Sequence, residues 1–219
     1  MLMKHHDNLP PVPADYEPPR RVRYDEYLRL ENEVTGKYEY HNGLMYPRFY
    51  PPGSYWAMAG GTVAHNDLTL NVLTALRSHL GRRGPCKVYM SDMKLKAGDS
   101  DFFPDAYVAC GETLPRQTRP DDAILICEVR SQSTAEFDRG DKFDAYKTLP
   151  GLQEYLLLDN RRKQASLFRK GEDGTWVYVT FSAGASIVLT TIDLEITVDA
   201  LYDGVTLDPD PLSRGQERA

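Results

Sequence analysis

The order of the expected elements predicts an α/β (α+β) fold, in which a mixed β-sheet is flanked by helices and carries an additional C-terminal β-hairpin. Residues 123–127 are all apolar, which is typical of a strand covered on both faces of a sheet. Apolar residues recur every three or four positions over 62–80, which predicts a long helix. Helix-like, hairpin-like and strand-like patterns follow one another along 24–202, as expected for helices packed on a mixed sheet.

The first part of the chain predicts an arm, a helix and a hairpin. Five prolines fall within residues 1–22, so this stretch is expected to be an extended or disordered arm. Residues 24–33 carry apolar side chains on one helical face. A hairpin is expected over 37–50, because Asn42-Gly43 is the dipeptide that most strongly favours a tight two-residue turn.

Further elements are expected along the second half of the chain. They are a long strand or bent strand pair over 86–96, strands over 103–108, 123–129 and 155–158, a helix between a capping box at Ser133 and Glu136 and a stop at Pro150-Gly151, a hairpin over 163–181, strand pattern over 187–196, and a short helix over 198–202. We therefore expect one domain over 23–203 and a loose polar tail over 204–219.

Composition narrows the classes of protein. The formal net charge is −6 and the pI is near 5.4, which argues against a generally basic nucleic-acid binder. No apolar run reaches membrane-spanning length, and no signal peptide is recognisable, so a cytoplasmic protein without a membrane partner is expected. Cys86, Cys110 and Cys127 show no metal-ligand spacing, and we interpret them as reduced core thiols.

Two carboxylates stand out within this pattern. Glu128 ends the most apolar strand, and Asp105 begins another strand directly after Pro104. If the two strands are neighbours, both carboxylates can point into one pocket, where they would make a minimal site for Mg²⁺. The alternative is that Asp105 is a turn residue and Glu128 a strand-end charge that reaches solvent.

Several motifs in this order resemble the PD-(D/E)XK nuclease superfamily, and within it the Uma-type restriction endonucleases. The motifs are Tyr38-Glu39 with Asn42-Gly43, residues 58–61 through His65-Asn66, Ser91-Asp92, Pro104-Asp105, Glu128-Val129 with Ser131 and Ser133-Thr134, residues 138–143 with Tyr146, and residues 152–159. The resemblance spans roughly Tyr24 to Tyr202. It implies a restriction-endonuclease-like fold and Mg²⁺-dependent hydrolysis of nucleic acid, with DNA as the expected substrate and Mn²⁺ as a possible substitute metal.

The resemblance also suggests roles for individual residues. Asp105 and Glu128 would hold the metal, and the backbone carbonyl of Val129 would be a further ligand, since hard cations accept backbone oxygen. Glu39 would sit on the rim of the same pocket, or would alternatively be an exposed strand charge. His65 would be a pocket residue that bonds a carboxylate or the phosphate, or alternatively a core histidine near the start of its helix.

The superfamily pattern places a lysine two residues after the glutamate, where this chain has Arg130. Arginine cannot serve as a base, and Lys142 on the following helix is the expected replacement. The alternative for Lys142 is a solvated helix lysine paired with Asp138.

Two functions remain open from the sequence. The first is a metal-dependent endonuclease, which the acidic pair favours. The second is a module of the same fold that binds nucleic acid or protein without cutting, which the acidic net charge favours. A homodimer is expected because closed two-fold pairs are the commonest oligomers, and Trp176, Tyr178 and Phe181 could expose part of their surface.

Overall fold

The computed structural model describes residues 19–33, 37–47, 62–81, 84–112, 117, 120, 122–130 and 140–207. The chain divides into two compact units, residues 1–61 and 62–219, and each is described by itself. The expected single domain over 23–203 stays a prediction. The first part of the helix predicted between Ser133 and Pro150, up to residue 139, and the tail beyond 207 lie outside the described residues.

The first unit is a small helix-and-hairpin body. Helix α1 (Tyr24–Glu33) follows strand β1 (Arg20–Arg21), which pairs with the hairpin of β2 (Tyr38–His41) and β3 (Leu44–Pro47). Asn42 and Gly43 both have positive φ, as the predicted tight turn requires. Stacked rings of Tyr27 and Tyr40, 4.9 Å apart, fill the core of this unit. Part of the predicted arm, 20–22, thus belongs to this unit, and residues 1–18 lie outside the described part.

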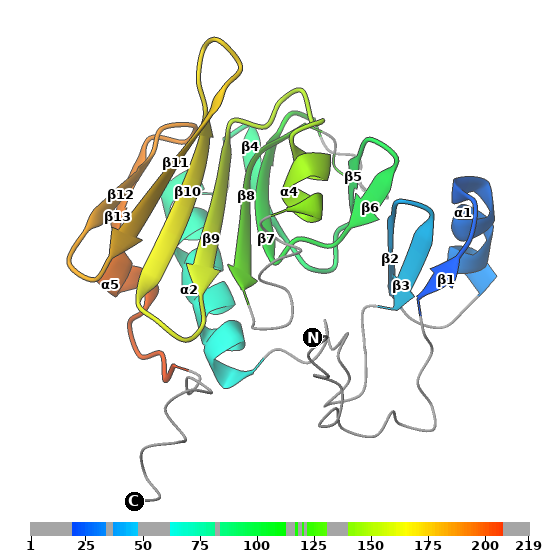
Figure 1. The fold of residues 1–219 in the computed structure, drawn as a ribbon. Helices are drawn as coiled ribbons and strands as arrows, with labels where there is room; N and C mark the ends of the chain where they lie inside the picture. Colours follow the sequence, from blue (N-terminus) through cyan, green and yellow to red (C-terminus); the bar gives the residue numbers. More distant parts are fainter. Residues whose placement is uncertain are drawn as a thin grey trace, which may run out of the picture. The chain divides into compact units, whose positions relative to one another are not determined.

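The second unit is built on a six-stranded mixed sheet (Figure 1). In sheet order its strands are β11 (Trp176–Ser182), β10 (Gln164–Lys170), β9 (Glu154–Asp159), β8 (Ala123–Arg130), β7 (Ala106–Cys110) and β4 (Cys86–Met90). Strands β8 and β9 are parallel, and the other neighbours are antiparallel. The carboxyl ends of β8 and β9 therefore lie at the same edge of the sheet, where β7 begins.

One face of this sheet is covered by α2 (Val63–Leu80), the hairpin of β12 (Ser186–Leu189) and β13 (Leu194–Thr197), and the short helix α5 (Val198–Leu201). Thr62 caps the start of α2, because its hydroxyl accepts a bond from the backbone N–H of His65, and Gly81 caps its end. Its buried side chains Leu68, Val72 and Leu76 are those that the sequence spacing predicts.

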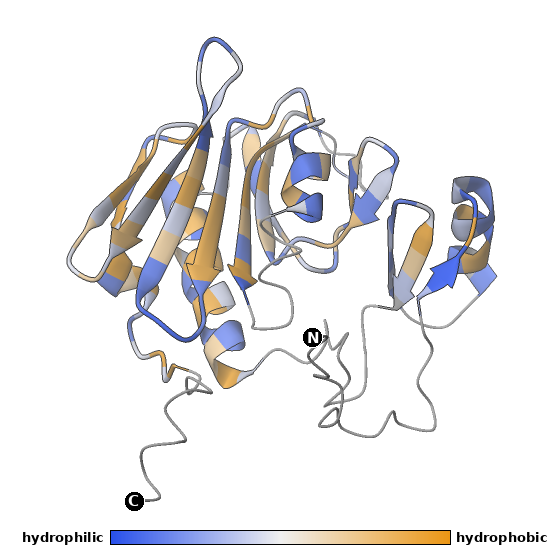
Figure 2. Cartoon of the chain, in the orientation of Figure 1, coloured by the Kyte–Doolittle hydropathy of each residue, from blue (hydrophilic) through white to orange (hydrophobic). Residues whose placement is uncertain are grey.

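The other face is covered by α4 (Asp141–Tyr146) and the hairpin of β5 (Leu95–Ala97) and β6 (Ser100–Phe102). Figure 2 shows hydrophobic colour along the central strands and hydrophilic colour at the loops. Both faces of β8 are buried, which agrees with the apolar run that predicts it. Among the described residues, no helix is long and apolar enough to span a bilayer.

Residues 86–96 form two strands, in agreement with the bent strand pair that the sequence offers beside one long strand: a turn closed by the Met93 N–H on the Met90 carbonyl separates β4 from β5. One expectation is corrected. The prediction of three reduced cysteines is wrong for two of them: Cys86 and Cys110 form a disulfide, and only Cys127 is free and buried. The cause is strand pairing, which sets Cys86 directly opposite Cys110 on β4 and β7.

Candidate active site

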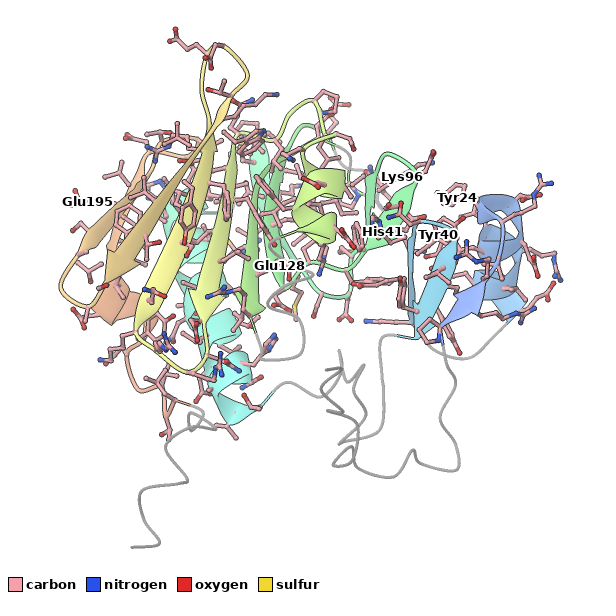
Figure 3. The ribbon with its side chains drawn as sticks, in the orientation of Figure 1. Tyr24, Tyr40, His41, Lys96, Glu128 and Glu195 are labelled. Carbon is pink, nitrogen blue, oxygen red and sulfur yellow. A yellow bond between two sulfur atoms is a disulfide. The ribbon has the colours of Figure 1, made fainter. Side chains whose placement is uncertain are left out.

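Asp105 and Glu128 meet at the edge of the sheet where β7 begins and β8 ends. Figure 3 shows Glu128 near that end of β8. Ala106 pairs with Cys127, so the residues before and after them face each other across the two strands. The backbone N–H of Asp105 donates to Glu128 Oε2 over 3.2 Å, and the N–H of Val129 donates to Asp105 Oδ2 over 2.9 Å. These reciprocal bonds fix both carboxylates on the backbone of the neighbouring strand.

Helix α4 brings a cation and a hydroxyl to Glu128. Lys142 Nζ lies 2.8 Å from Glu128 Oε1, and the two side chains are 7% and 4% exposed. The hydroxyl of Tyr146 donates to the same oxygen over 2.9 Å. Burial makes a charged pair costly unless its partners are well placed, and Glu128 has a cation, a hydroxyl and a backbone N–H around it. The cluster is therefore a compact, water-poor charge network.

His65 approaches the cluster from α2, which covers the face of the sheet opposite to α4. It lies in the first turn of α2, and its Nε2 is 3.1 Å from Asp105 Oδ2. Burial would raise the pKa of Asp105, but the bonds from His65 and from the Val129 N–H, together with the positive charge of Lys142, outweigh burial and lower it below the ordinary value. Asp105 is thus held as a carboxylate at neutral pH.

The structure brings together Asp105, Glu128, His65 and Lys142. Glu39 lies on β2 in the first unit, so its place at this pocket stays a prediction. Lys147, the other lysine near the end of α4, pairs with Asp144 instead. Arg130 forms an ion pair with Asp159 over 3.0 Å. Its contacts with the described residues include neither Glu128 nor Asp105.

From the sequence, Tyr146 was assigned no role in the site. Its hydroxyl in fact binds Glu128, and the signal for this lay in its spacing. Tyr146 follows Lys142 by four residues, so both side chains stand on the same face of α4.

The donor set suits a hard cation. Asp105 and Glu128 offer carboxylate oxygens on rigid strands. Asp105 contacts the described residues through Oδ2, which bonds His65 and the Val129 N–H, and through its own backbone N–H. No group of three or more histidine, cysteine or acidic side chains within the described ranges is arranged to hold a metal. Mg²⁺ commonly needs only one or two carboxylates and keeps water or phosphate oxygens as its other ligands, so two carboxylates are sufficient.

Comparison with known proteins places this chain in a family. Residues 24–199 match the model of the Uma2 family, which is described as "Putative restriction endonuclease". The chain belongs to the Uma2 family. The match covers the stretch that carries Asp105, Glu128 and Lys142 and confirms the resemblance seen in the sequence.

Two uncharacterised proteins of Synechocystis sp. are similar to this Uma2 chain. One is 32% identical over 83% of this chain and 91% of its own length, and the other is 35% identical over 69% and 82%. A crystal structure from Anabaena variabilis, described as a putative nuclease belonging to DUF820, matches with a TM-score of 0.63. It covers 83% of this chain and 97% of its own at 14% identity, so it confirms the mixed α+β fold.

Proposed function

We propose that this Uma2 protein is a metal-dependent endonuclease that hydrolyses phosphodiester bonds of nucleic acid, with DNA as the substrate. The observation that carries the proposal is the contact set of Asp105, Glu128 and Lys142: two carboxylates on adjacent strands with a buried lysine 2.8 Å from one of them. Membership in a family described as putative restriction endonucleases supports nuclease activity.

Each side chain of the cluster has a distinct task in this proposal. Asp105 and Glu128 would hold Mg²⁺, with the Val129 carbonyl as a further ligand; Mn²⁺ would be accepted by the same oxygens. A bound Mg²⁺ would polarise a phosphoryl oxygen and lower the pKa of a water molecule. Lys142 stabilises negative charge that develops beside Glu128, and His65 fixes the orientation of Asp105.

Cleavage assays test the proposal directly. Supercoiled plasmid and labelled single-stranded DNA are incubated with the full chain in Mg²⁺, in Mn²⁺ and in EDTA. We expect cleavage only with metal, and a loss of at least about a hundredfold in Asp105→Asn and in Glu128→Gln. Glu195→Gln, which alters an exposed carboxylate of β13, is the matched control.

Metal binding is measured separately, because a non-cleaving module could still bind DNA. Calorimetry with Mn²⁺ should show a site in the parent protein that Asp105→Asn and Glu128→Gln each weaken strongly. Unchanged Mn²⁺ binding in both variants would remove the two carboxylates from the metal site. DNA binding without cleavage under any metal would favour the alternative function.

A homodimer is part of the same proposal. Strand β11 is at the edge of the six-stranded sheet, and Val177, Tyr178 and Val179 on it are 44–56% exposed. An exposed edge strand with apolar side chains is a surface on which a second copy can pair. Sedimentation equilibrium at micromolar concentration should show a dimer, and Val179→Lys should shift it to monomer.

A further inference from the structure

A basic turn follows β9 at the edge of the sheet that carries the active-site cluster. Arg161, Arg162 and Lys163 are consecutive; Arg162 and Lys163 are exposed and Arg161 is partly exposed. Because β8 and β9 are parallel and Glu128 pairs with Leu157, the turn emerges beside the end of β8. Three successive cations are a distinct local charge in a chain whose formal net charge is −6.

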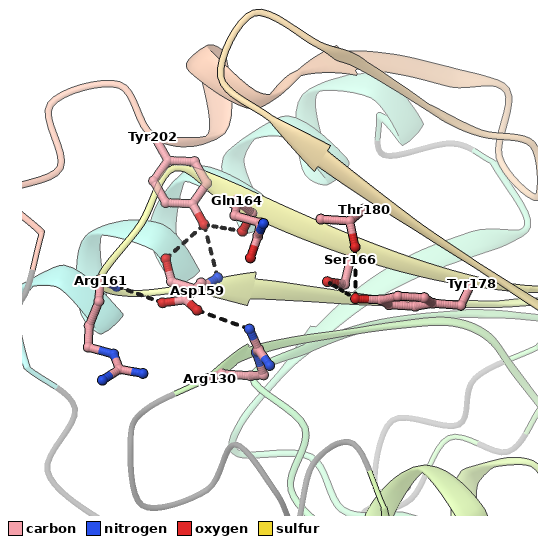
Figure 4. A network of polar contacts seen from close by, with 8 residues as sticks. All are labelled: Arg130, Asp159, Arg161, Gln164, Ser166, Tyr178, Thr180 and Tyr202. Carbon is pink, nitrogen blue, oxygen red and sulfur yellow. Dashed lines mark hydrogen bonds and ion pairs between the residues drawn. The ribbon is translucent and has the colours of Figure 1, made fainter. Parts of the chain in front are cut away.

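Asp159 anchors this turn. Its Oδ1 accepts the backbone N–H of Arg161 over 2.9 Å, and its Oδ2 accepts Arg130 over 3.0 Å. Its backbone N–H donates to the hydroxyl of Tyr202 over 2.9 Å, and that hydroxyl in turn donates to the carbonyls of Asp159 and Gln164. Figure 4 shows Arg130 and Arg161 beside Asp159, with the guanidinium group of Arg130 directed at the Asp159 carboxylate. The turn is therefore held in a fixed position.

Arg130 connects the turn with the active-site cluster. It lies two residues after Glu128 on β8, so both side chains stand on the same face of the sheet, about 7 Å apart along the strand. Arg130 is only 9% exposed, and among the described residues its Nε is buried without a hydrogen-bond partner. A buried N–H group without an acceptor is costly, and an incoming anion would supply the acceptor.

We propose that Arg130 and the basic turn, residues 161–163, bind the phosphodiester backbone of the nucleic acid next to the bond that is cut. The inference rests on the proposed function and names the part of the substrate that this edge recognises. Guanidinium groups match phosphate oxygens with paired N–H donors, and a fixed turn loses little freedom on binding. The contact of Lys163 with Asp199, 3.7 Å long and about half exposed, is weak enough to yield to a phosphate.

The salt dependence of DNA binding tests the proposal. Fluorescence anisotropy with labelled duplex and single-stranded DNA is recorded in EDTA, so that no strand is cut. For each phosphate contact that a variant loses, the decrease of log K with log salt becomes shallower by about 0.9 for duplex and about 0.7 for single-stranded DNA. Between about 50 and about 200 mM salt, the parent should thus lose about threefold more affinity than Arg161→Gln on duplex.

Two further variants sharpen the comparison. Lys170→Gln removes one charge at the other end of β10, about 20 Å away along the strand, and should bind as the parent does. Arg130→Lys keeps the charge opposite Asp159 but loses the planar fork, so it should bind more weakly at every salt concentration with an unchanged slope. Circular dichroism and urea midpoints show whether each variant is folded.

The outcomes separate this inference from the proposed function. If Arg161→Gln keeps the affinity and slope of Lys170→Gln, or the parent binds neither form of DNA, the inference is overturned, even where the parent cuts DNA in an Asp105-dependent way. If Arg161→Gln loses affinity and slope while the parent cuts nothing with any metal, the basic turn binds the phosphodiester backbone but no bond is cut beside it, and the nuclease proposal fails.

Discussion

Lys142 is the residue for which the structure distinguishes most clearly between the two interpretations that the sequence offers. A solvated helix lysine would be exposed, whereas this side chain is 7% exposed and 2.8 Å from Glu128. We expect Lys142→Met to remain folded and to bind Mn²⁺, but to cleave at least about a hundredfold more slowly, because one preorganised positive charge is lost. Steady-state cleavage of plasmid DNA measures the effect.

Lys147→Met is the matched control for this substitution. Lys147 follows α4 and pairs with Asp144, away from Glu128 among its described contacts, so its loss should leave cleavage unchanged. Arg130→Met provides the competing outcome. If Arg130→Met is inactive while Lys142→Met cleaves at the parent's rate, the catalytic cation is Arg130.

Asp105 predicts a pH dependence of stability. Burial opposes its ionisation, but His65, the Val129 N–H and Lys142 bring its folded-state pKa below the ordinary value. The folded state then binds fewer protons than the unfolded state, so the stabilisation is present above the unfolded pKa of about 3.9 and is lost as pH falls through the folded pKa.

Urea unfolding in EDTA from neutral to acidic pH checks this prediction. Asp105→Asn cannot ionise at this position, so its free energy of unfolding should differ most from the parent's at neutral pH. The difference should shrink below about pH 4. A difference that stays constant over the whole range would show that ionisation of Asp105 does not stabilise the fold.

Among the elements, the β12–β13 hairpin is bonded through its turn to a buried carboxylate on another strand. Glu154 on β9 is fully buried and accepts bonds from Arg169, from both the N–H and hydroxyl of Thr190, and from both the N–H and hydroxyl of Thr191. We expect Glu154→Gln to lower the free energy of unfolding by about 2–3 kcal/mol, because a neutral amide accepts fewer of these bonds.

Hydrogen exchange gives a second readout for this hairpin. Amides of β12 and β13 should exchange faster in Glu154→Gln, whereas Glu195→Gln on exposed β13 should change neither exchange nor stability. Equal protection in both variants would mean that apolar packing of Ile187 and Leu189 is sufficient to hold the hairpin in place.

The elements also show what the sequence could predict. The spacing of Leu68, Val72 and Leu76, with Thr62 before it and Gly81 after it, located α2 within one residue, because helix caps and apolar periodicity are local signals. The closeness of Asp105 and Glu128 was predictable because one begins and the other ends a strand of an apolar sheet. The disulfide was not, because the choice of strand partner for β4 depends on tertiary packing and not on the spacing of Cys86 and Cys110.

For the whole molecule, the disulfide gives a test of both stability and cellular location. Closing the loop between Cys86 and Cys110, a separation of 24 residues, should stabilise the fold by about 3 kcal/mol. Urea unfolding of the Cys86→Ser, Cys110→Ser double variant should show this loss, and the parent with reducing agent should match the variant.

Thiol alkylation followed by mass spectrometry identifies the state in the cell. If Cys86 and Cys110 are bonded in the cell, they will be alkylated only after reduction. That result would argue against the expected cytoplasmic location, since disulfides are rare in the cytoplasm. Cys127, which is buried and free, is present in the parent and in the double variant and serves as the internal reference. If reducing agent leaves the stability of the parent unchanged, the two sulfurs do not form a stabilising bond.

Tyr202 determines when the fold can be completed during synthesis. Its hydroxyl ties to Asp159, 43 residues earlier, and with Val198 and Leu201 it belongs to the core against α2. A chain emerging from the ribosome carries Asp105, Glu128 and Lys142 well before it carries Tyr202. Until then one face of the sheet lacks its last cover, and the backbone N–H of Asp159 lacks this acceptor. We therefore expect the sheet that carries the candidate site to be fully covered only in chains that extend at least to Tyr202.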